Sequence, residues 1–322
     1  MKNIFNYIKV LISIALLTAL VWIMRDKLAG IGGILAGANK LLIVSSLGLM
    51  LVALFMQSYR LKFLLDAQSI HLTIKDVTFL TLIGQFFNNF MPTSIGGDVV
   101  KAYYASHGTE RKLETFTSVA IDRMLGVITL MWVAVAALIM RPDEMANKAI
   151  FFIIALMTVI GTFFMAVIFN KRAAKIILFF KKLTRQQKTK DQLQRLYEAT
   201  NKYRHHKILI FHALWLSITA QLIFFYMSYL LTRSIYSGVS FVFLMLTLPA
   251  VCTLSMLPSL NGLGIRESGF VYFLGSVMGK ENAFALSLLY LAVTLTVSLI
   301  GGVVFLFKRE FKHITKSEVT IK

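Results

Sequence analysis

The chain has 322 residues, is 57% apolar, carries a formal charge of +19 and contains a single cysteine, Cys252. Its apolar fraction exceeds that of typical soluble domains, and the lone cysteine excludes an internal disulfide and a multi-cysteine metal site. Several stretches are apolar all round over close to the ~20 residues that a transmembrane helix needs, so we expect an all-α polytopic membrane protein.

Six stretches are long and apolar enough to be complete transmembrane helices. The first follows Lys2 and Lys9 and ends near Trp22 and Arg25. Because no small-residue cleavage site follows it, we interpret it as an uncleaved span and not as a signal peptide. The glycines near 30–37 lie in the outer connection after it and are predicted to form a flexible linker and not a phosphate cradle. In chain order, the six predicted spans are 4–24, 41–59, 115–140, 149–170, 208–232 and 282–307.

Two further apolar stretches, 77–106 and 239–278, are each interrupted by a proline, a small polar residue and a glycine. The first break lies in FMPTSIGGDVVK, from Phe90, and the second in MLPSLNGLGIRE, from Met256. Bare backbone survives inside a bilayer only where it is buried in protein or lines a polar cavity. The first stretch is longer than one span needs and shorter than two, so re-entrant helical hairpins are predicted. The residues predicted to form the hairpin tips are Pro92, Thr93, Gly96, Gly97, Pro258, Ser259, Asn261, Gly262 and Gly264.

The distribution of lysine and arginine favours this topology. With hairpins and cytoplasmic termini, most basic residues lie inside, including the segment 171–207 and Arg60 in the connection 60–76. If each broken stretch crossed once, the basic residues would divide more evenly and the basic C-terminus would lie outside. A basic segment beside a membrane suits the anionic cytoplasmic leaflet, so no nucleic-acid partner is expected.

This topology makes the chain an inverted repeat. The first half, 1–140, has its hairpin entering from the cytoplasm, and the second half, 141–310, has its hairpin entering from outside, followed by a cytoplasmic tail, 311–322. Inverted repeats bring such tips together near the midplane, at a site that opens alternately to either side. The expected location is the cell membrane.

Ionisable residues within or beside these segments are the candidate site. A charge at the bilayer centre costs at least ~2.5–3.5 kcal/mol, so each is expected to have a partner or a watery cavity. Arg266 is the strongest candidate because it follows the glycine-rich break, where a helix N-terminus and a guanidinium both suit a phosphate. Arg123 is predicted to couple to the first hairpin or to snorkel to the inner interface. The candidate substrate-binding residues are three cations, three carboxylates and two amides: Arg266, Lys101, Arg123, Asp98, Asp122, Glu267, Asn88 and Asn89.

No motif of a soluble enzyme is present. The histidines lack metal-ligand spacing with acids or cysteine, and there is no nucleophile elbow, Walker loop or dinucleotide fingerprint. No catalytic residue, metal or cofactor is therefore predicted.

Three motifs together resemble the flippase-like family, also called the lysylphosphatidylglycerol synthase transmembrane region. They are PTSIGGDVVKAYYAS, IDRMLG from Ile121 to Gly126, and LPSLNGLGIRES. The resemblance covers nearly the whole chain and implies a bacterial or archaeal membrane protein that moves or modifies lipids. Two-part members also carry a cytosolic aminoacyl-transferase domain, which we expect to be missing here. Asn261 stands where many relatives carry glycine or serine, which leaves the shape of the second tip open.

Two functions follow as expectations. The first is a flippase that moves an anionic phospholipid or a polyprenyl-phosphate lipid between leaflets by alternating access at the hairpin tips. The second is a membrane-embedded component of headgroup modification, such as lysylphosphatidylglycerol synthesis, with Asp98 or Glu267 as a base, or an accessory subunit of a separate lipid-modifying enzyme. A homodimer is compatible with either function.

Overall fold

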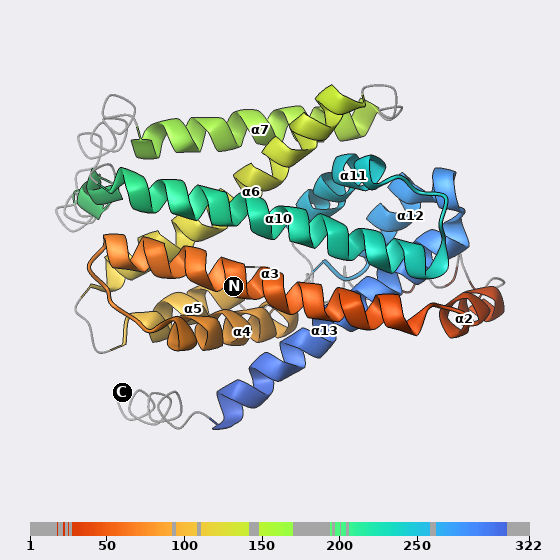
Figure 1. The fold of residues 1–322 in the computed structure, drawn as a ribbon, viewed down its shortest axis with the longest axis horizontal. Coiled ribbons are helices and arrows are strands. Elements are labelled where there is room, and N and C mark those ends of the chain that lie inside the picture. Colours follow the sequence, from red (N-terminus) through yellow and green to blue (C-terminus); the bar gives the residue numbers. More distant parts are fainter. Residues whose placement is uncertain are drawn as a thin grey trace.

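The computed structural model describes residues 28–91, 95–107, 111–141, 148–169, 197–199, 201–203, 206–257 and 262–307, together with positions 18, 22, 25 and 194. Over these residues the fold is entirely helical (Figure 1). Most of the predicted first span, most of the basic segment 171–207 and the whole tail 311–322 lie outside the described residues. The same holds for five predicted tip residues, Pro92, Thr93, Pro258, Ser259 and Asn261.

In the described part of the chain, four helices are long and apolar enough to cross a membrane: α3 (Lys40–Ala67), α6 (Lys112–Met140), α10 (Lys207–Ile235) and α13 (Lys280–Phe307). Each contains one predicted span and extends beyond it. α3 and α10 lie side by side along much of their length (Figure 1). α7 (Lys148–Phe169), which corresponds to the predicted span 149–170, packs against α6.

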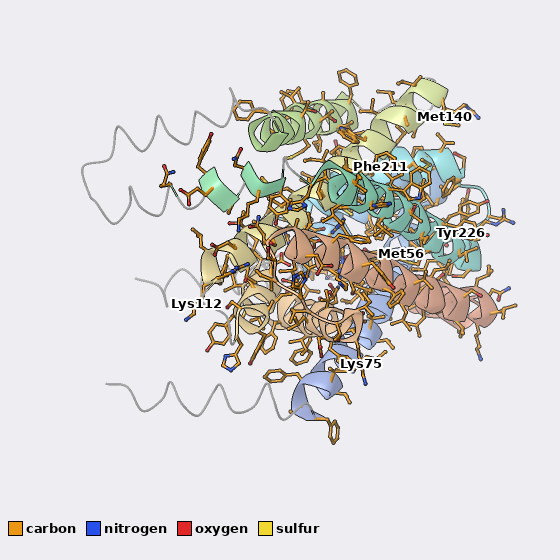
Figure 2. All side chains as sticks on the ribbon, turned by 60° about the vertical axis from the view of Figure 1, so that its left-hand side comes forward. Met56, Lys75, Lys112, Met140, Phe211 and Tyr226 are labelled. Atoms are coloured by element: carbon orange, nitrogen blue, oxygen red, sulfur yellow. The ribbon has the colours of Figure 1, made fainter. Side chains whose placement is uncertain are left out.

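Large apolar side chains cover the outer surfaces of these helices. Phe211 and Tyr226 on α10 and Met140 on α6 are all exposed (Figure 2). Apolar surface on this scale suits contact with lipid and not with water. The apolar, all-helical architecture is that of a multi-pass membrane protein.

Each interrupted stretch folds as two shorter helices with the break between them. The first consists of α4 (Ile74–Phe90) and α5 (Gly96–Ala105), and the second of α11 (Phe241–Leu254) and α12 (Ile265–Met278). α4 ends before Pro92, as expected because a proline disfavours helical backbone in the residue before it.

The two helices of each stretch pack against each other. In the first, Ala105 at the end of α5 clusters with Leu80 near the start of α4, so α5 runs back along α4. In the second, Gly269 of α12 lies against Val251 and Leu254 of α11. Each interrupted stretch is therefore a pair of packed helices.

Side-chain caps fix where several of these helices begin. The Asn39 Oδ1 accepts hydrogen bonds from the N–H groups of Leu41 and Leu42 at the start of α3. Thr73 caps α4 and Ser240 caps α11 in the same way. These short polar side chains satisfy N–H groups that have no partner inside the helix.

The prediction of a flexible linker near 30–37 is wrong. Most of this segment forms α2 (Leu28–Ala36), whose Ile31 and Leu35 pack with Phe284 of α13. Each glycine weakens a helix by about 1 kcal/mol relative to alanine. In α2, burial of the apolar side chains at helical spacing outweighs the weakening of the helix by its glycines.

Gly301 permits the close approach of α13 to α4, and we expect Gly301→Ala to destabilise the fold. A Cβ atom at this position would collide with the carbonyl oxygen of Leu82, a backbone atom that cannot turn aside. Overpacking of this kind typically costs about 1–3 kcal/mol, so the melting temperature in detergent should fall. The matched control is Gly48→Ala on α3, where the added methyl meets no atom within 4 Å. An equal fall for both variants would contradict the close approach.

Candidate functional site

Residues beside both breaks line two adjoining cavities of about 270 and 200 Å³, which share part of their walls. Asn88 of α4 lines both cavities, and Met256, which follows α11, does so as well. The residues shared by the two walls are Gln85, Asn88, Arg123, Phe224, Cys252, Met256 and Tyr290.

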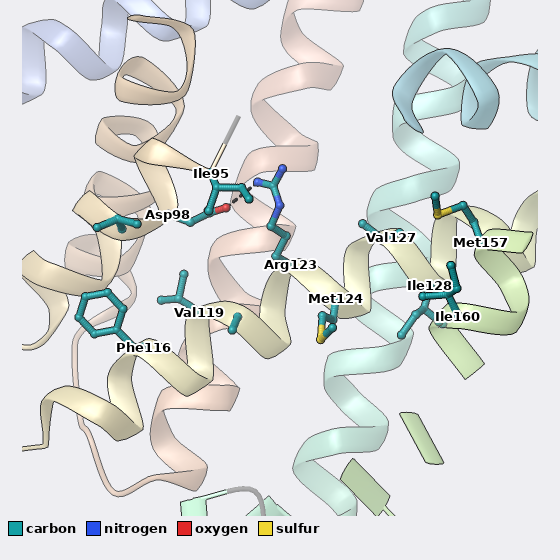
Figure 3. A pocket seen from close by; sticks show the side chains of 13 residues that line it. Ile95, Asp98, Phe116, Val119, Arg123, Met124, Val127, Ile128, Met157 and Ile160 are labelled. Atoms are coloured by element: carbon teal, nitrogen blue, oxygen red, sulfur yellow. Dashed lines mark hydrogen bonds and ion pairs between the residues drawn. The ribbon is translucent and has the colours of Figure 1, made fainter. Parts of the chain in front are cut away.

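Asp98, in the first turn of α5, bridges two cations at the wall of the larger cavity. Its Oδ2 accepts a hydrogen bond from NH1 of Arg123 on α6 at 2.5 Å (Figure 3). Its Oδ1 lies 3.2 Å from Nζ of Lys101. We call these three residues the Asp98 triad. The Arg123 side chain remains 29% exposed, whereas those of Asp98 and Lys101 are 12% and 9% exposed. One carboxylate between two cations leaves a formal charge of +1 at this point. Arg123 is thus coupled to the first helix pair.

Glycines bring α5 close enough to α4 to place the triad. A Cβ atom on Gly97 would collide with the carbonyl oxygen of Gly84 on α4. The Gly97 N–H donates to Oδ1 of Asn88 at 2.8 Å, which satisfies one N–H group in the first turn of α5. Asn88 therefore lines the cavities and also joins the two helices, whereas Asn89 lines neither of the two cavities.

The assignment of Arg60 to a cytoplasmic connection is wrong. α3 continues through this position, and Arg60 is buried against α6 and α10. Its Nε donates to Oδ1 of Asp122 at 2.6 Å, and its NH1 donates to Oγ of Ser217 at 2.7 Å. Arg60 and Asp122 both line the larger cavity. Arg60 is therefore a site residue that the sequence interpretation missed.

A sequence signal for this placement exists. Leu61, Leu64 and Leu65 continue the apolar helical pattern past the predicted end of the span, and all three are buried. The charge at Arg60 ended the predicted span too early. The identity of its partner, Asp122, depends on how α3 and α6 pack and has no signature in the spacing.

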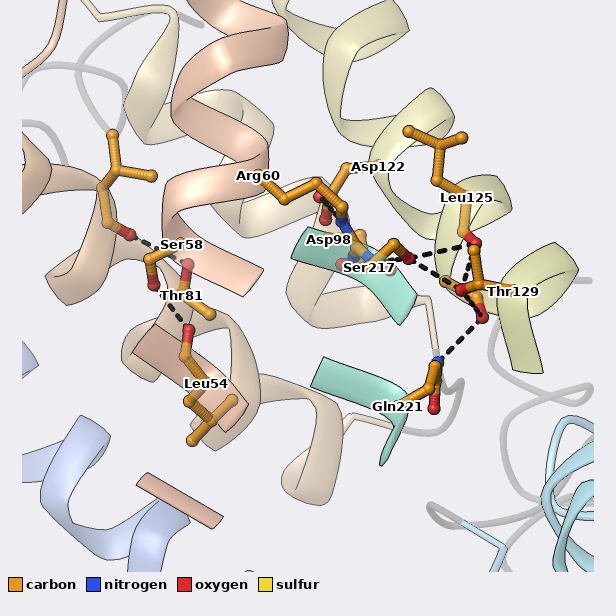
Figure 4. A network of polar contacts seen from close by, with 12 residues as sticks. Leu54, Ser58, Arg60, Thr81, Asp98, Asp122, Leu125, Thr129, Ser217 and Gln221 are labelled. Atoms are coloured by element: carbon orange, nitrogen blue, oxygen red, sulfur yellow. Dashed lines mark hydrogen bonds and ion pairs between the residues drawn. The ribbon is translucent and has the colours of Figure 1, made fainter. Parts of the chain in front are cut away.

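Hydrogen bonds extend this ion pair into a network between α3, α6 and α10 (Figure 4). The hydroxyls of Ser217 and Thr129 lie 2.7 Å apart, and Ser217 also donates to the carbonyl oxygen of Leu125. The Gln221 side chain donates to the carbonyl oxygen of Gly126 at 2.9 Å. Partners of this kind are what buried polar groups require, so the network holds Arg60 and Asp122 in fixed positions.

The second break carries a charge pair of its own. Nε and NH2 of Arg266 both donate to Oε1 of Glu267, at 3.1 and 2.7 Å. Oε2 of Glu267 accepts the N–H of Gly264 at 2.6 Å, and the guanidinium lies over the Tyr290 ring at 5.5 Å. Gly262 and Gly264 have φ angles of +76° and +81°, in the left-handed region that favours glycine. Arg266 thus faces the smaller cavity with its charge compensated, and Glu267 occupies part of the place expected for a phosphate.

The site suits anion binding better than base catalysis. Asp98, Asp122 and Glu267 each accept a hydrogen bond from an arginine, so all three carboxylates serve as partners of cations. In the described residues, no group of three or more His, Cys, Asp or Glu side chains is placed to hold a metal ion. Arginine and lysine around a partly open cavity are the groups that bind phosphate.

Comparison with known proteins finds a match to a family model. No curated protein matches the chain closely enough to be compared with it. A family model described as the lysylphosphatidylglycerol synthase TM region matches residues 8–302, which include both breaks and all residues of the two cavities. The match confirms the resemblance carried by the three motifs and indicates a membrane protein related to lipid modification or flipping. Because the match spans nearly the whole sequence, the chain belongs to the lysylphosphatidylglycerol synthase TM region family.

Proposed function

We propose that the protein is a flippase that moves an anionic, phosphate-bearing lipid between the leaflets of the cell membrane. The observation that carries this proposal is a surplus of one positive charge at the cavity. Among the described residues that line the two cavities or pair with a lining residue, four are cations and three are carboxylates. The cations are Arg60, Lys101, Arg123 and Arg266.

The surplus lies at the Asp98 triad. Arg60 and Arg266 each have a carboxylate of their own, whereas Lys101 and Arg123 share Asp98. An uncompensated charge inside a membrane is costly, so it marks a place where a bound anion from outside the protein neutralises the surplus positive charge. A phosphodiester headgroup carries the single negative charge required.

We further propose that the two helix pairs are re-entrant hairpins in an inverted repeat of 1–140 and 141–310. In this arrangement α4–α5 enters from the cytoplasm, α11–α12 enters from outside, both termini are cytoplasmic, and the complete spans are 4–24, α3, α6, α7, α10 and α13. Support comes from the basic residues concentrated on the proposed inner side and from the shared cavity beside both breaks. A cavity reached from opposite faces can open to each side in turn.

A reconstitution assay tests the transport function. Purified protein is placed in phosphatidylcholine vesicles that contain a trace of fluorescent phosphatidylglycerol or fluorescent phosphatidylcholine, and transfer is read from quenching by external dithionite. We expect the anionic probe to cross about tenfold faster than the zwitterionic probe, the effect of one charge-assisted hydrogen bond. The assay is run with and without imposed proton and sodium gradients. The proposal would be refuted if, under every gradient, lipid transfer were no faster than in vesicles without protein. Equal transfer rates for the two probes would refute it as well.

The family description favours one alternative, a component of lysylphosphatidylglycerol synthesis. Incubation of the same protein with lysyl-tRNA and phosphatidylglycerol, followed by lipid chromatography, separates the two functions. A lysylated lipid product would support the alternative, and its absence together with selective transfer would support the flippase.

A further inference from the structure

An apolar groove opens beside the Asp98 triad, between α5, α6 and α7 (Figure 3). Its volume is about 400 Å³, within the range of cavities that hold small organic ligands. α5 and its N-terminal boundary contribute Ile95 and Val99, α6 contributes Val119, and α7 contributes Met157 and Ile160. This lining suits a hydrocarbon and offers little to a polar solute.

The groove adjoins the polar cavity and shares part of its wall. Asp98, Arg123 and Val127 line both the groove and the 270 Å³ cavity. A molecule with its charged end at Arg123 could therefore place its apolar part in the groove. The surplus positive charge lies at the junction of the two spaces, where the head and the tail of a lipid meet.

The outer side of the groove is open. Ile95 and Val99 are 57% and 50% exposed, and Phe116 and Ile160 are also exposed. At the far end, α6 and α7 approach so closely that a Cβ atom on Gly161 would come within 2.7 Å of the Ile128 side chain. The groove therefore has a packed end between α6 and α7 and an apolar open side.

We propose that this groove holds an acyl chain of a glycerophospholipid whose phosphate binds Lys101 and Arg123, and that it is the lateral entrance for that lipid. The inference rests on the proposed transport function and names its substrate class and its route. A phosphodiester carries one negative charge and matches the surplus of one at the triad, whereas a phosphate monoester carries about −1.5 to −2 at pH 7. The charge therefore favours a glycerophospholipid over a polyprenyl monophosphate.

Photolabelling tests the groove directly. The protein is reconstituted in phosphatidylcholine nanodiscs with a trace of phosphatidylglycerol or phosphatidylcholine, each carrying a diazirine on one acyl chain, and labelled peptides are identified by mass spectrometry. We expect phosphatidylglycerol to label 116–128 and 151–163 about tenfold more than phosphatidylcholine does. Equal labelling by the two probes would mean ordinary contact with surrounding lipid and would overturn the inference.

A pair of tryptophan variants on α6 provides the matched control. Ala120 lines the groove and Ala136 does not, and both alanines are exposed, so neither substitution fills a packed core. Ala120→Trp should reduce phosphatidylglycerol labelling to the phosphatidylcholine level, and Ala136→Trp should leave it unchanged. If Ala120→Trp does not fold, Val99→Trp blocks the opposite wall. Equal losses of phosphatidylglycerol labelling in the groove and control variants would overturn the inference. In a competition measurement, displacement of the probe by unlabelled polyprenyl phosphate but not by unlabelled phosphatidylglycerol would overturn it as well.

The same preparations separate this inference from the transport function. Transfer between leaflets without selective labelling would refute the groove and keep the flippase. Selective labelling without transfer would support lipid binding in the groove and refute the flippase.

Discussion

Replacing Arg123 with alanine is expected to slow transfer of the anionic lipid about 10- to 100-fold, the range that corresponds to a hydrogen bond to a charged group. The substitution removes the surplus positive charge, because Lys101 and Asp98 then form a neutral pair. It also removes the most exposed side chain of the Asp98 triad. The zwitterionic lipid should be affected much less, so the selectivity between the two probes should fall together with the rate.

Arg233→Ala is the matched control for this variant. Arg233 lies in the last turn of α10, is exposed and donates to the hydroxyl of Tyr229, and it lines neither of the two cavities. Both variants remove one positive charge from the chain. Arg123→Lys keeps the charge but loses the planar two-pronged donor, so a smaller loss is expected. Equal rates for Arg123→Ala and Arg233→Ala would exclude the Asp98 triad as the headgroup site.

The two breaks are not equivalent in charge. Next to the first, Lys101 and Arg123 share one carboxylate, and next to the second, Arg266 and Glu267 neutralise each other. The sequence places a cation and a carboxylate close to both breaks, and it favours Arg266 because a helix N-terminus and a guanidinium after the glycine-rich break both suit a phosphate. In the structure, the partners of Arg266 are supplied within its own helix pair and by the Tyr290 ring, so the uncompensated charge lies at the first break.

Local features of the fold were predictable from the sequence because they depend on local chemistry. The boundary between α4 and α5 follows from Pro92 and the two glycines after it, and the apolar runs give the long helices. Membrane burial is costly for any charge, which brought Asp98, Lys101, Asp122 and Arg123 into the candidate site before any geometry was available. These four residues do line the larger cavity.

Pairing between distant helices was not predictable. Arg60 and Asp122 are 62 positions apart, and only the packing of α3 on α6 brings them together. A single charge at the apparent end of an apolar run is equally compatible with a buried ion pair and with a solvated loop. The prediction for α2 was wrong for a different reason: its glycines favour a loop locally, but packing against α13 outweighs that local preference.

Arg60→Ala is expected to destabilise the protein by about 3–5 kcal/mol, because it leaves Asp122 buried without its cation. Asp122→Ala should have a similar effect by leaving Arg60 uncompensated. Lys62→Ala is the control two residues away: Lys62 pairs with Asp66 on a partly exposed surface, where such a pair contributes about 0–1 kcal/mol. Unfolding in detergent measures all three variants, and comparable losses for Lys62→Ala and Arg60→Ala would contradict a buried pair.

The double variant Arg60→Met/Asp122→Leu distinguishes a structural pair from a functional one. Replacing both charges with apolar side chains leaves no buried charge without a partner, so most of the lost stability should return, and fully additive losses would show that the two residues do not interact. The double variant keeps the total surplus of one positive charge at the cavities, whereas Arg60→Ala alone leaves the Asp122 carboxylate unpaired and reduces the total to zero. If the surplus charge selects the lipid, the double variant should therefore retain preferential transfer of the anionic probe, and the single variant should lose both stability and preference.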